Sequence, residues 1–182
     1  MTQQPNHWKG ALLGLIGGAA GTYVMGEHIK LVTRVLGSNP LARTVGDGPH
    51  ALDHISLIGT HHHPDESSTA ALGRIAYHTL TGQDPNDETK NVLSYLVDYA
   101  YGSLQGGVYG AFTGGSIPKN MIAGPVFGTI IWLLGDEGAV SLLGLADGPT
   151  KFPLSEHLHR WAVHIAYGTA TAATTTALRR VL

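Results

Sequence analysis

The stretch GALLGLIGGAAGTYVM (residues 10–25) combines a long apolar run with glycine at every fourth position, at Gly10, Gly14 and Gly18. A glycine inside a water-soluble helix costs about 1 kcal/mol relative to alanine, so a soluble bundle is expected to avoid such a row. In a lipid bilayer, small residues at this spacing form a smooth stripe along which two helices approach closely. The stretch therefore predicts a membrane helix that packs through its glycines.

Three further runs share this character, and the full set is Trp8–Met25, Tyr99–Pro118, Asn120–Gly135 and Trp161–Leu178. Apart from Lys9, these runs contain no Lys, Arg, Asp or Glu. A membrane-spanning helix needs roughly 20 mostly apolar residues. Glycine recurs at the same spacing in the second and third runs, at Gly102, Gly106, Gly110, Gly114, Gly124 and Gly128. We expect an all-α, polytopic membrane protein with four transmembrane helices.

Helix-stop signals mark the ends of four long helices, which we expect to form a single domain. Gly37 followed by Pro40 ends the first helix, because a left-handed cap precedes a residue that cannot continue the hydrogen-bond ladder. The expected helices cover residues 8–36, 88–115, 118–143 and 154–181. The polar segment 38–87 between the first two is too long for a plain connection. Its apolar spacing predicts a short interfacial helix over residues 67–81.

Composition narrows the function classes for this chain of 182 residues. Charged residues make up 13%, about half the usual share, and the net charge is −2 without a basic stripe, which argues against nucleic-acid binding. The absence of cysteine excludes disulfides and thiolate catalysis. No arrangement of residues indicates a reaction, so we expect a protein that is not an enzyme. A soluble, glycine- and alanine-rich helical protein is the alternative to the membrane interpretation.

The distribution of positive charge predicts the orientation. Lys9, Lys119, Arg179 and Arg180 fall on the side of the two termini, where the sequence has no acidic residue. Loops rich in Lys and Arg stay in the cytoplasm. We therefore expect both termini to be cytoplasmic and the long loop to be extracytoplasmic.

Several segments carry a resemblance that spans most of the chain. They are Glu66–Tyr77, Tyr99–Gly102, Val108–Gly110, Trp132–Glu137, Phe152–Ser155 and His164–Gly168. In this order they resemble the YagU-like group of small bacterial inner-membrane proteins, a domain of unknown function. The resemblance implies four membrane helices in a bacterial inner membrane and, for one member, a link with acid tolerance, but no catalytic residues. The chain departs from the group at Asp98, where a histidine is expected.

Depth counting predicts a layer of ionisable groups inside the membrane. At about 1.5 Å per helical residue, five side chains fall at one height below the outer surface: Glu27, Asp98, Asp136, Glu137 and His164. Buried ionisable residues normally face the bundle interior. The layer could share protons, hold a cation, pin the helix register, or lie at the headgroups in contact with water. Glu137 is expected to face away, because adjacent helical residues diverge by about 100°.

A histidine tract, His61, His62 and His63, is a candidate metal site because imidazoles with nearby carboxylates suit Zn, Ni or Cu. Three consecutive histidines do not readily reach one ion, so a solvated loop is the alternative, and the imidazoles could also respond to pH. His164 and His28 do not form a facing pair for haem. No cofactor is identified, and bound lipid is expected.

Three functions fit these patterns. The first is a non-enzymatic inner-membrane protein that handles protons or senses pH through the carboxylate and histidine layer. The second is an accessory subunit of a larger respiratory or photosynthetic membrane complex, or a homo-oligomer, packed through glycine-rich faces. The third is a membrane metal-binding protein.

Overall fold

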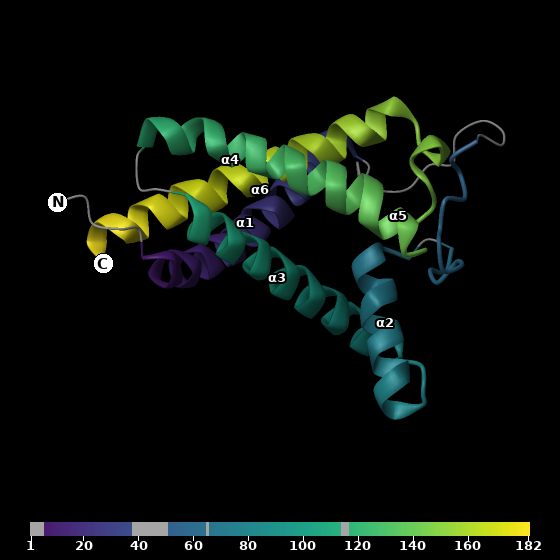
Figure 1. Ribbon diagram of the computed structural model, residues 1–182. Helices are drawn as coiled ribbons and strands as arrows, with labels where there is room; N and C mark the ends of the chain where they lie inside the picture. The colour runs from purple at the N-terminus through teal and green to yellow at the C-terminus, as the bar shows by residue number, and fades with distance from the viewer. Residues whose placement is uncertain (1–5, 38–50, 65, 114–116) are drawn as a thin grey trace.

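The computed structural model describes residues 6–37, 51–64, 66–113 and 117–182. Its elements, in chain order, are α1 (His7–Leu36), α2 (Ser68–Thr81), α3 (Asp87–Phe112), α4 (Ile117–Ile131), the π-helical η1 (Trp132–Ala139), α5 (Val140–Leu142), the 3-10 turn η2 (Pro149–Lys151) and α6 (Leu154–Val181) (Figure 1). Because Ile131 and Val140 have right-handed helical dihedral angles, the helix continues from α4 through η1 into α5.

Local capping explains where several helices begin and end. The side chains of Asn6, Ser67 and Asn86 accept hydrogen bonds from backbone N–H groups in the first turns of α1, α2 and α3. These bonds satisfy donors that a helix start otherwise leaves unpaired. Gly37 and Gly82 end α1 and α2 with φ of 70° and 71°, a conformation that favours glycine.

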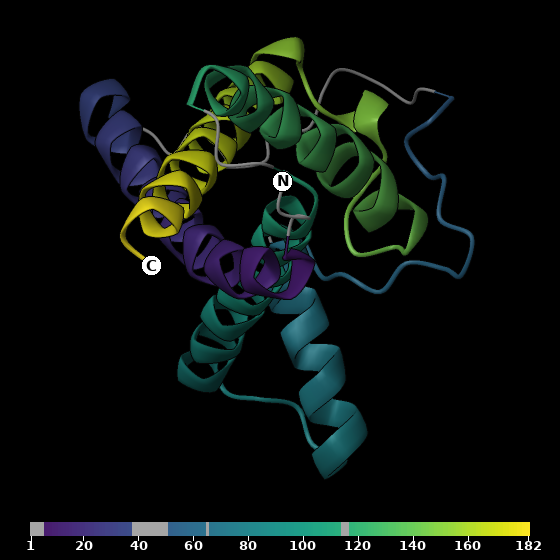
Figure 2. The same ribbon diagram turned by 60° about the vertical axis from the view of Figure 1, so that its left-hand side comes forward.

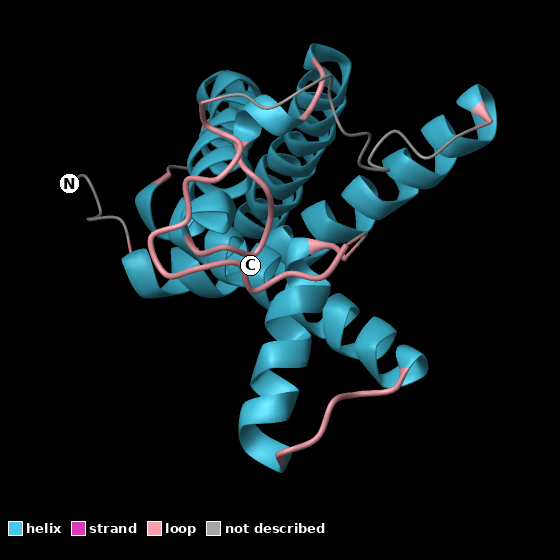
Figure 3. Ribbon diagram, turned by 90° about the vertical axis from the view of Figure 1, so that its right-hand side faces the viewer, coloured by secondary structure: helices cyan, strands magenta, loops and turns pink. Residues whose placement is uncertain are grey.

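The long helices pack in the spatial order α3, α1, α6 and α4 (Figures 1 and 2). Helix α1 lies between α3 and α6, and α4 covers the other side of α6. Helix α2 packs against the first part of α3. Figure 3 shows α2 and the beginning of α3 extending away from the other helices, joined by a short loop.

The contact between α1 and α3 is made backbone to backbone. Gly10 faces the carbonyl of Gly110, and Gly14 faces that of Gly106. A Cβ at either glycine would overlap that oxygen. Since rising numbers on α1 meet falling numbers on α3, the two helices are antiparallel. The four-residue glycine spacing therefore sets both the close approach and the register.

Two further antiparallel interfaces are also packed closely through glycines. On its second face, α1 places Gly17 against Thr175 and Gly21 against Thr171 of α6. The α4–α6 contact pairs Gly124 with the carbonyl of Gly168, and it also pairs Gly128 with that of His164, one helical turn away on each helix. Aromatic rings then join three helices, because Phe127 lies 4.9 Å from Tyr109 and 6.0 Å from Tyr167, measured between ring centroids.

The described part of the long loop runs beside the turn that precedes α6. The backbone N–H of Leu57 donates to the carbonyl of Leu142, and the N–H of His61 donates to that of Gly144, at 2.9 and 2.8 Å. The N–H of Gly148 donates to the carbonyl of Asp53 at 2.8 Å. Gly144 has a φ of 66° and approaches the backbone of Gly59 closely. The loop therefore packs against the segment between α5 and η2.

The all-α fold expected from the sequence is confirmed for the described residues, which contain no strand. Each of the four expected long helices has a counterpart, and α2 matches the expected short helix. The second long helix ends at Phe112, and residues 114–116, where it was expected to finish, lie outside the described part, as do 38–50 of the loop. Among the helices that the structure describes, none is both long enough and apolar enough to cross a membrane.

The glycine contacts predict opposite effects for the same substitution at two sites on α1. Gly14→Ala places a Cβ against the backbone of Gly106, which cannot move aside as a flexible side chain would, and should lower the free energy of unfolding by about 1–3 kcal/mol. Gly26→Ala is the matched control, because nothing lies within 4 Å of its added Cβ. It should be neutral or stabilising by up to about 1 kcal/mol. Thermal unfolding followed by circular dichroism measures both, and equal effects would contradict this account of the interface.

Candidate functional site

Five ionisable side chains gather where η1 meets the start of α6, and we call this group the Arg160 centre: Asp136, Glu137, Glu156, His157 and Arg160. Arg160 Nη2 donates to Glu156 Oε1 at 2.5 Å, and both side chains are buried. Arg160 Nη1 lies 3.8 Å from Asp136 Oδ2. The guanidinium carbon also lies 4.8 Å from the centroid of the Phe152 ring. Arg160 is therefore held by two carboxylates and an aromatic face.

The hydrogen bond between His157 and Glu137 depends on which of the two side chains is protonated. His157 Nε2 lies 2.9 Å from the carbonyl oxygen of Pro149, which only accepts hydrogen bonds, so this nitrogen carries a proton. His157 Nδ1 lies 2.8 Å from Glu137 Oε1. A hydrogen bond there needs one more proton, held by either the imidazole or the carboxyl. The donor in this contact is therefore either the imidazolium of His157 or the carboxyl of Glu137.

The π-helical backbone of η1 explains how adjacent acids reach the same neighbour. The N–H of Val140 donates to the carbonyl of Gly135, five residues earlier, where an α-helix would use four. The wider turn changes the angular positions of the side chains, and π-helical segments occur frequently at functional sites. Contrary to the expectation that Glu137 faces away, Asp136 and Glu137 both contact α6.

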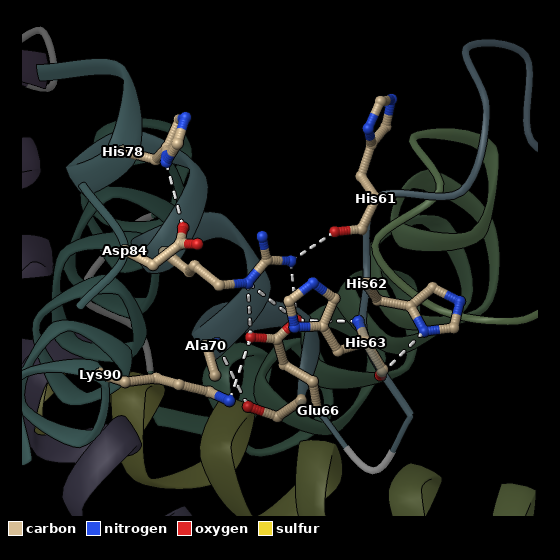
Figure 4. A network of polar contacts seen from close by, with 10 residues as sticks. His61, His62, His63, Glu66, Ala70, His78, Asp84 and Lys90 are labelled. Carbon is tan, nitrogen blue, oxygen red and sulfur yellow. Dashed lines mark hydrogen bonds and ion pairs between the residues drawn. The ribbon is translucent and has the colours of Figure 1, made fainter. Parts of the chain in front are cut away.

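A second cluster joins the long loop, α2 and α3, and we call it the Glu66 cluster: Glu66, Arg74 and Lys90 (Figure 4). The carboxylate of Glu66 is fully buried. It accepts bonds from Arg74 Nη2 at 2.9 Å and from the backbone N–H of His63 at 2.9 Å, and it lies 3.3 Å from Lys90 Nζ. Burial alone would raise the pKa of Glu66, but the hydrogen bonds from Arg74 and His63 outweigh it and lower the pKa to about 2.

The structure does not bring the five residues of the expected polar layer together. Glu27 is exposed and pairs with Lys30 on its own helix at 2.7 Å. Asp98 lies beside Thr69 of α2. His164 Nδ1 donates to the carbonyl of Arg160 at 2.7 Å.

The register of the α4–α6 interface places His164 and Asp136 at different heights. Gly128 of α4 lies opposite His164 of α6, and Asp136 comes eight residues after Gly128 in the helix that continues from α4, a rise of about 12 Å. Only Asp136 and Glu137 of the expected layer therefore share a site.

The histidine tract has side chains that serve different contacts (Figure 4). His61 Nε2 donates to the carbonyl of Ile58 at 2.9 Å. His62 Nε2 lies 3.6 Å from Asp147 Oδ1, and the contribution of His63 to the Glu66 cluster is its backbone N–H. Within the described residues, no three His, Asp, Glu or Cys side chains are placed to hold one metal ion. Asp65, which follows the tract, lies outside the described part.

Sequence reasoning missed Arg160 and Glu66, the residues around which these two clusters form. Arg160 comes one residue before the fourth apolar run, and Glu156 precedes it by four, the spacing of an ion pair on one helix face. That spacing could have identified the Glu156–Arg160 ion pair. The sequence signal for the Glu66–Arg74 ion pair is weaker, because eight residues and the start of a helix separate the two.

Comparison with known proteins leaves the site to be interpreted from its own geometry. No protein-family model, curated protein or solved structure matches this chain. The resemblance to the YagU-like group therefore stays a prediction.

The lowered pKa of Glu66 predicts an acid-sensitive contribution to stability. Because the folded pKa is about 2 and the ordinary value 4.5, the contribution is complete above about pH 4.5 and is lost as the pH falls toward 2. Glu66→Gln should lower the free energy of unfolding at pH 6 by up to about 3 kcal/mol. This deficit relative to wild type should shrink below pH 4.5.

Thermal unfolding across this pH range measures the deficit. Glu88→Gln, an exposed acid in the first turn of α3, is the control and should show little change. A Glu66→Gln deficit that stays constant from pH 6 to pH 2 would contradict the assignment.

Proposed function

We propose that this chain is a multi-pass membrane protein that passes protons across the bilayer by binding and releasing them at the Arg160 centre. The single observation that carries the functional part is the 2.8 Å contact between His157 Nδ1 and Glu137 Oε1. Fully ionised, Asp136, Glu137 and Glu156 place three negative charges around the one fixed positive charge of Arg160. The centre therefore approaches neutrality by binding protons, and Glu137 and His157 are the pair that exchanges one.

The distribution of side chains supports placement in a membrane. On α3, the glycines that face α1 are buried, whereas Leu104 and Val108 are 65% and 54% exposed. Helices α1 and α4 show the same arrangement, with glycines at the contacts between helices and large apolar side chains exposed. The exposed side chains are Leu12, Ile16, Ile122, Val126 and Ile130. Large exposed apolar patches are rare on soluble monomeric proteins. In lipid, small residues inside and large apolar residues outside are expected.

Internal hydrogen bonding reconciles this surface with the modest apolar character of the helices. Glycine lowers the mean hydropathy of a helix, but most glycines of α1, α3 and α4 lie at contacts between helices. Thr169 and Thr176 donate their hydroxyl protons to carbonyls four residues earlier, at 2.7 and 2.6 Å. Their polar groups are therefore satisfied within α6.

Cysteine labelling tests the membrane placement, because the chain has no cysteine of its own. Leu104→Cys and Glu88→Cys both place a thiol at an exposed position of α3. In broken-cell membranes, where both faces are accessible, a water-soluble maleimide should label Cys at position 88 and leave position 104 unlabelled until detergent denatures the protein. Equal labelling of the two variants, or release of the protein by alkaline carbonate, would refute the placement.

Proton exchange is tested with the purified protein in vesicles that contain a pH-sensitive dye. Glu137→Gln preserves the contact with His157, because an amide N–H can donate to Nδ1 without a titrating proton. After an external pH step, wild-type vesicles should equilibrate faster than protein-free vesicles, and the variant should not. Glu88→Gln is the matched control and should behave as wild type. Equal rates for wild type and Glu137→Gln would remove the proposal.

A further inference from the structure

An apolar groove of about 260 Å³ lies between the first turns of α4 and the last turns of α6. Its walls include Met121, Ala172, Ala173, Thr176 and Ala177, and among the described residues that line it Arg180 alone is charged. The small side chains of α6 leave the space open beside Met121. Since the threonine hydroxyls that line it are bonded to helix carbonyls, the groove offers an apolar wall that ends at a guanidinium.

The surroundings of Arg180 favour an anion. Arg180 is exposed and forms no ion pair with any residue in the described part of the chain. Two neighbouring cations are already engaged, since Lys9 Nζ donates to the Leu182 carbonyl at 2.7 Å and Arg179 donates to the Gly110 carbonyl. The sequence of α6 has no acid after Glu156. This end of the molecule therefore presents positive charge without a compensating acid on α6.

We propose that the groove binds one anionic phospholipid, with a segment of an acyl chain along Ala173 and Ala177 and the phosphate at Arg180. The inference rests on the membrane placement proposed above. The groove is smaller than the roughly 300–1,000 Å³ typical of sites that enclose a whole small molecule, so it fits part of one chain. A basic residue at the end of an apolar groove between helices is suited to an anionic lipid headgroup.

Native mass spectrometry of the full chain in detergent tests the proposal. Phosphatidylglycerol and phosphatidylcholine with identical acyl chains are added in separate titrations, and inorganic phosphate in a third. We expect one phosphatidylglycerol to bind more tightly than phosphatidylcholine, and phosphate alone not to compete. Arg180→Gln should weaken phosphatidylglycerol binding by about fivefold, the effect of roughly 1 kcal/mol for one basic side chain. Arg34→Gln, an exposed arginine on α1, is the matched control and should bind as wild type.

A second pair of variants tests the acyl-chain part. Ala177→Phe fills the groove and should weaken binding of both lipids, whereas Ala100→Phe, at an exposed position of α3, should not. The proposal would be overturned by equal affinity for the two lipids or by unchanged binding in Arg180→Gln. Competition by phosphate alone, or a dimer that holds no lipid, would also overturn it. The cysteine labelling described above distinguishes failure of the lipid site from failure of the membrane placement. A protected position 104 with no preference for phosphatidylglycerol rejects only the lipid site.

Discussion

Close backbone contact between antiparallel helices is the constraint on which the rest of this structure depends. Helix α1 carries glycines on two faces, so it approaches α3 through Gly10 and Gly14 and α6 through Gly17 and Gly21. At each of these positions a Cβ would meet a carbonyl oxygen or a threonine hydroxyl on the facing helix. Short separations increase the number of van der Waals contacts along the helices, and they leave the larger apolar side chains for the outer surface.

The register set by these contacts positions the polar chemistry. The α4–α6 interface pairs Gly128 with the carbonyl of His164, and the helix that continues from α4 through η1 then reaches Arg160. The π-helical turn presents both Asp136 and Glu137 to α6. Three carboxyls thus meet one guanidinium and one imidazole at the junction of η1 and α6.

The long loop connects the two polar clusters of the molecule. Its His61 carbonyl accepts a hydrogen bond from Arg74 of the Glu66 cluster at 2.6 Å. Near its other described end, Asp53 accepts a bond from Thr150 at 2.8 Å, beside the 3-10 turn whose Pro149 carbonyl binds His157. The loop therefore contacts the surroundings of both clusters. The carboxylate of Glu66, whose pKa is about 2, remains ionised over the pH range in which histidine ordinarily titrates.

Local signals in the sequence were sufficient for the helices and for the glycine faces, because capping residues and four-residue spacing act within one or two turns. Gly14 and Gly106 could be recognised as packing positions before their partnership was known. Tertiary structure alone decided the composition of the polar site. Depth counting assumed equal starting heights for ideal helices, but the actual register offsets His164 from Asp136, and Asp98 faces α2. Glu137 joins His157 from a π-helical segment, and the two residues lie on different helices, 20 positions apart in the sequence.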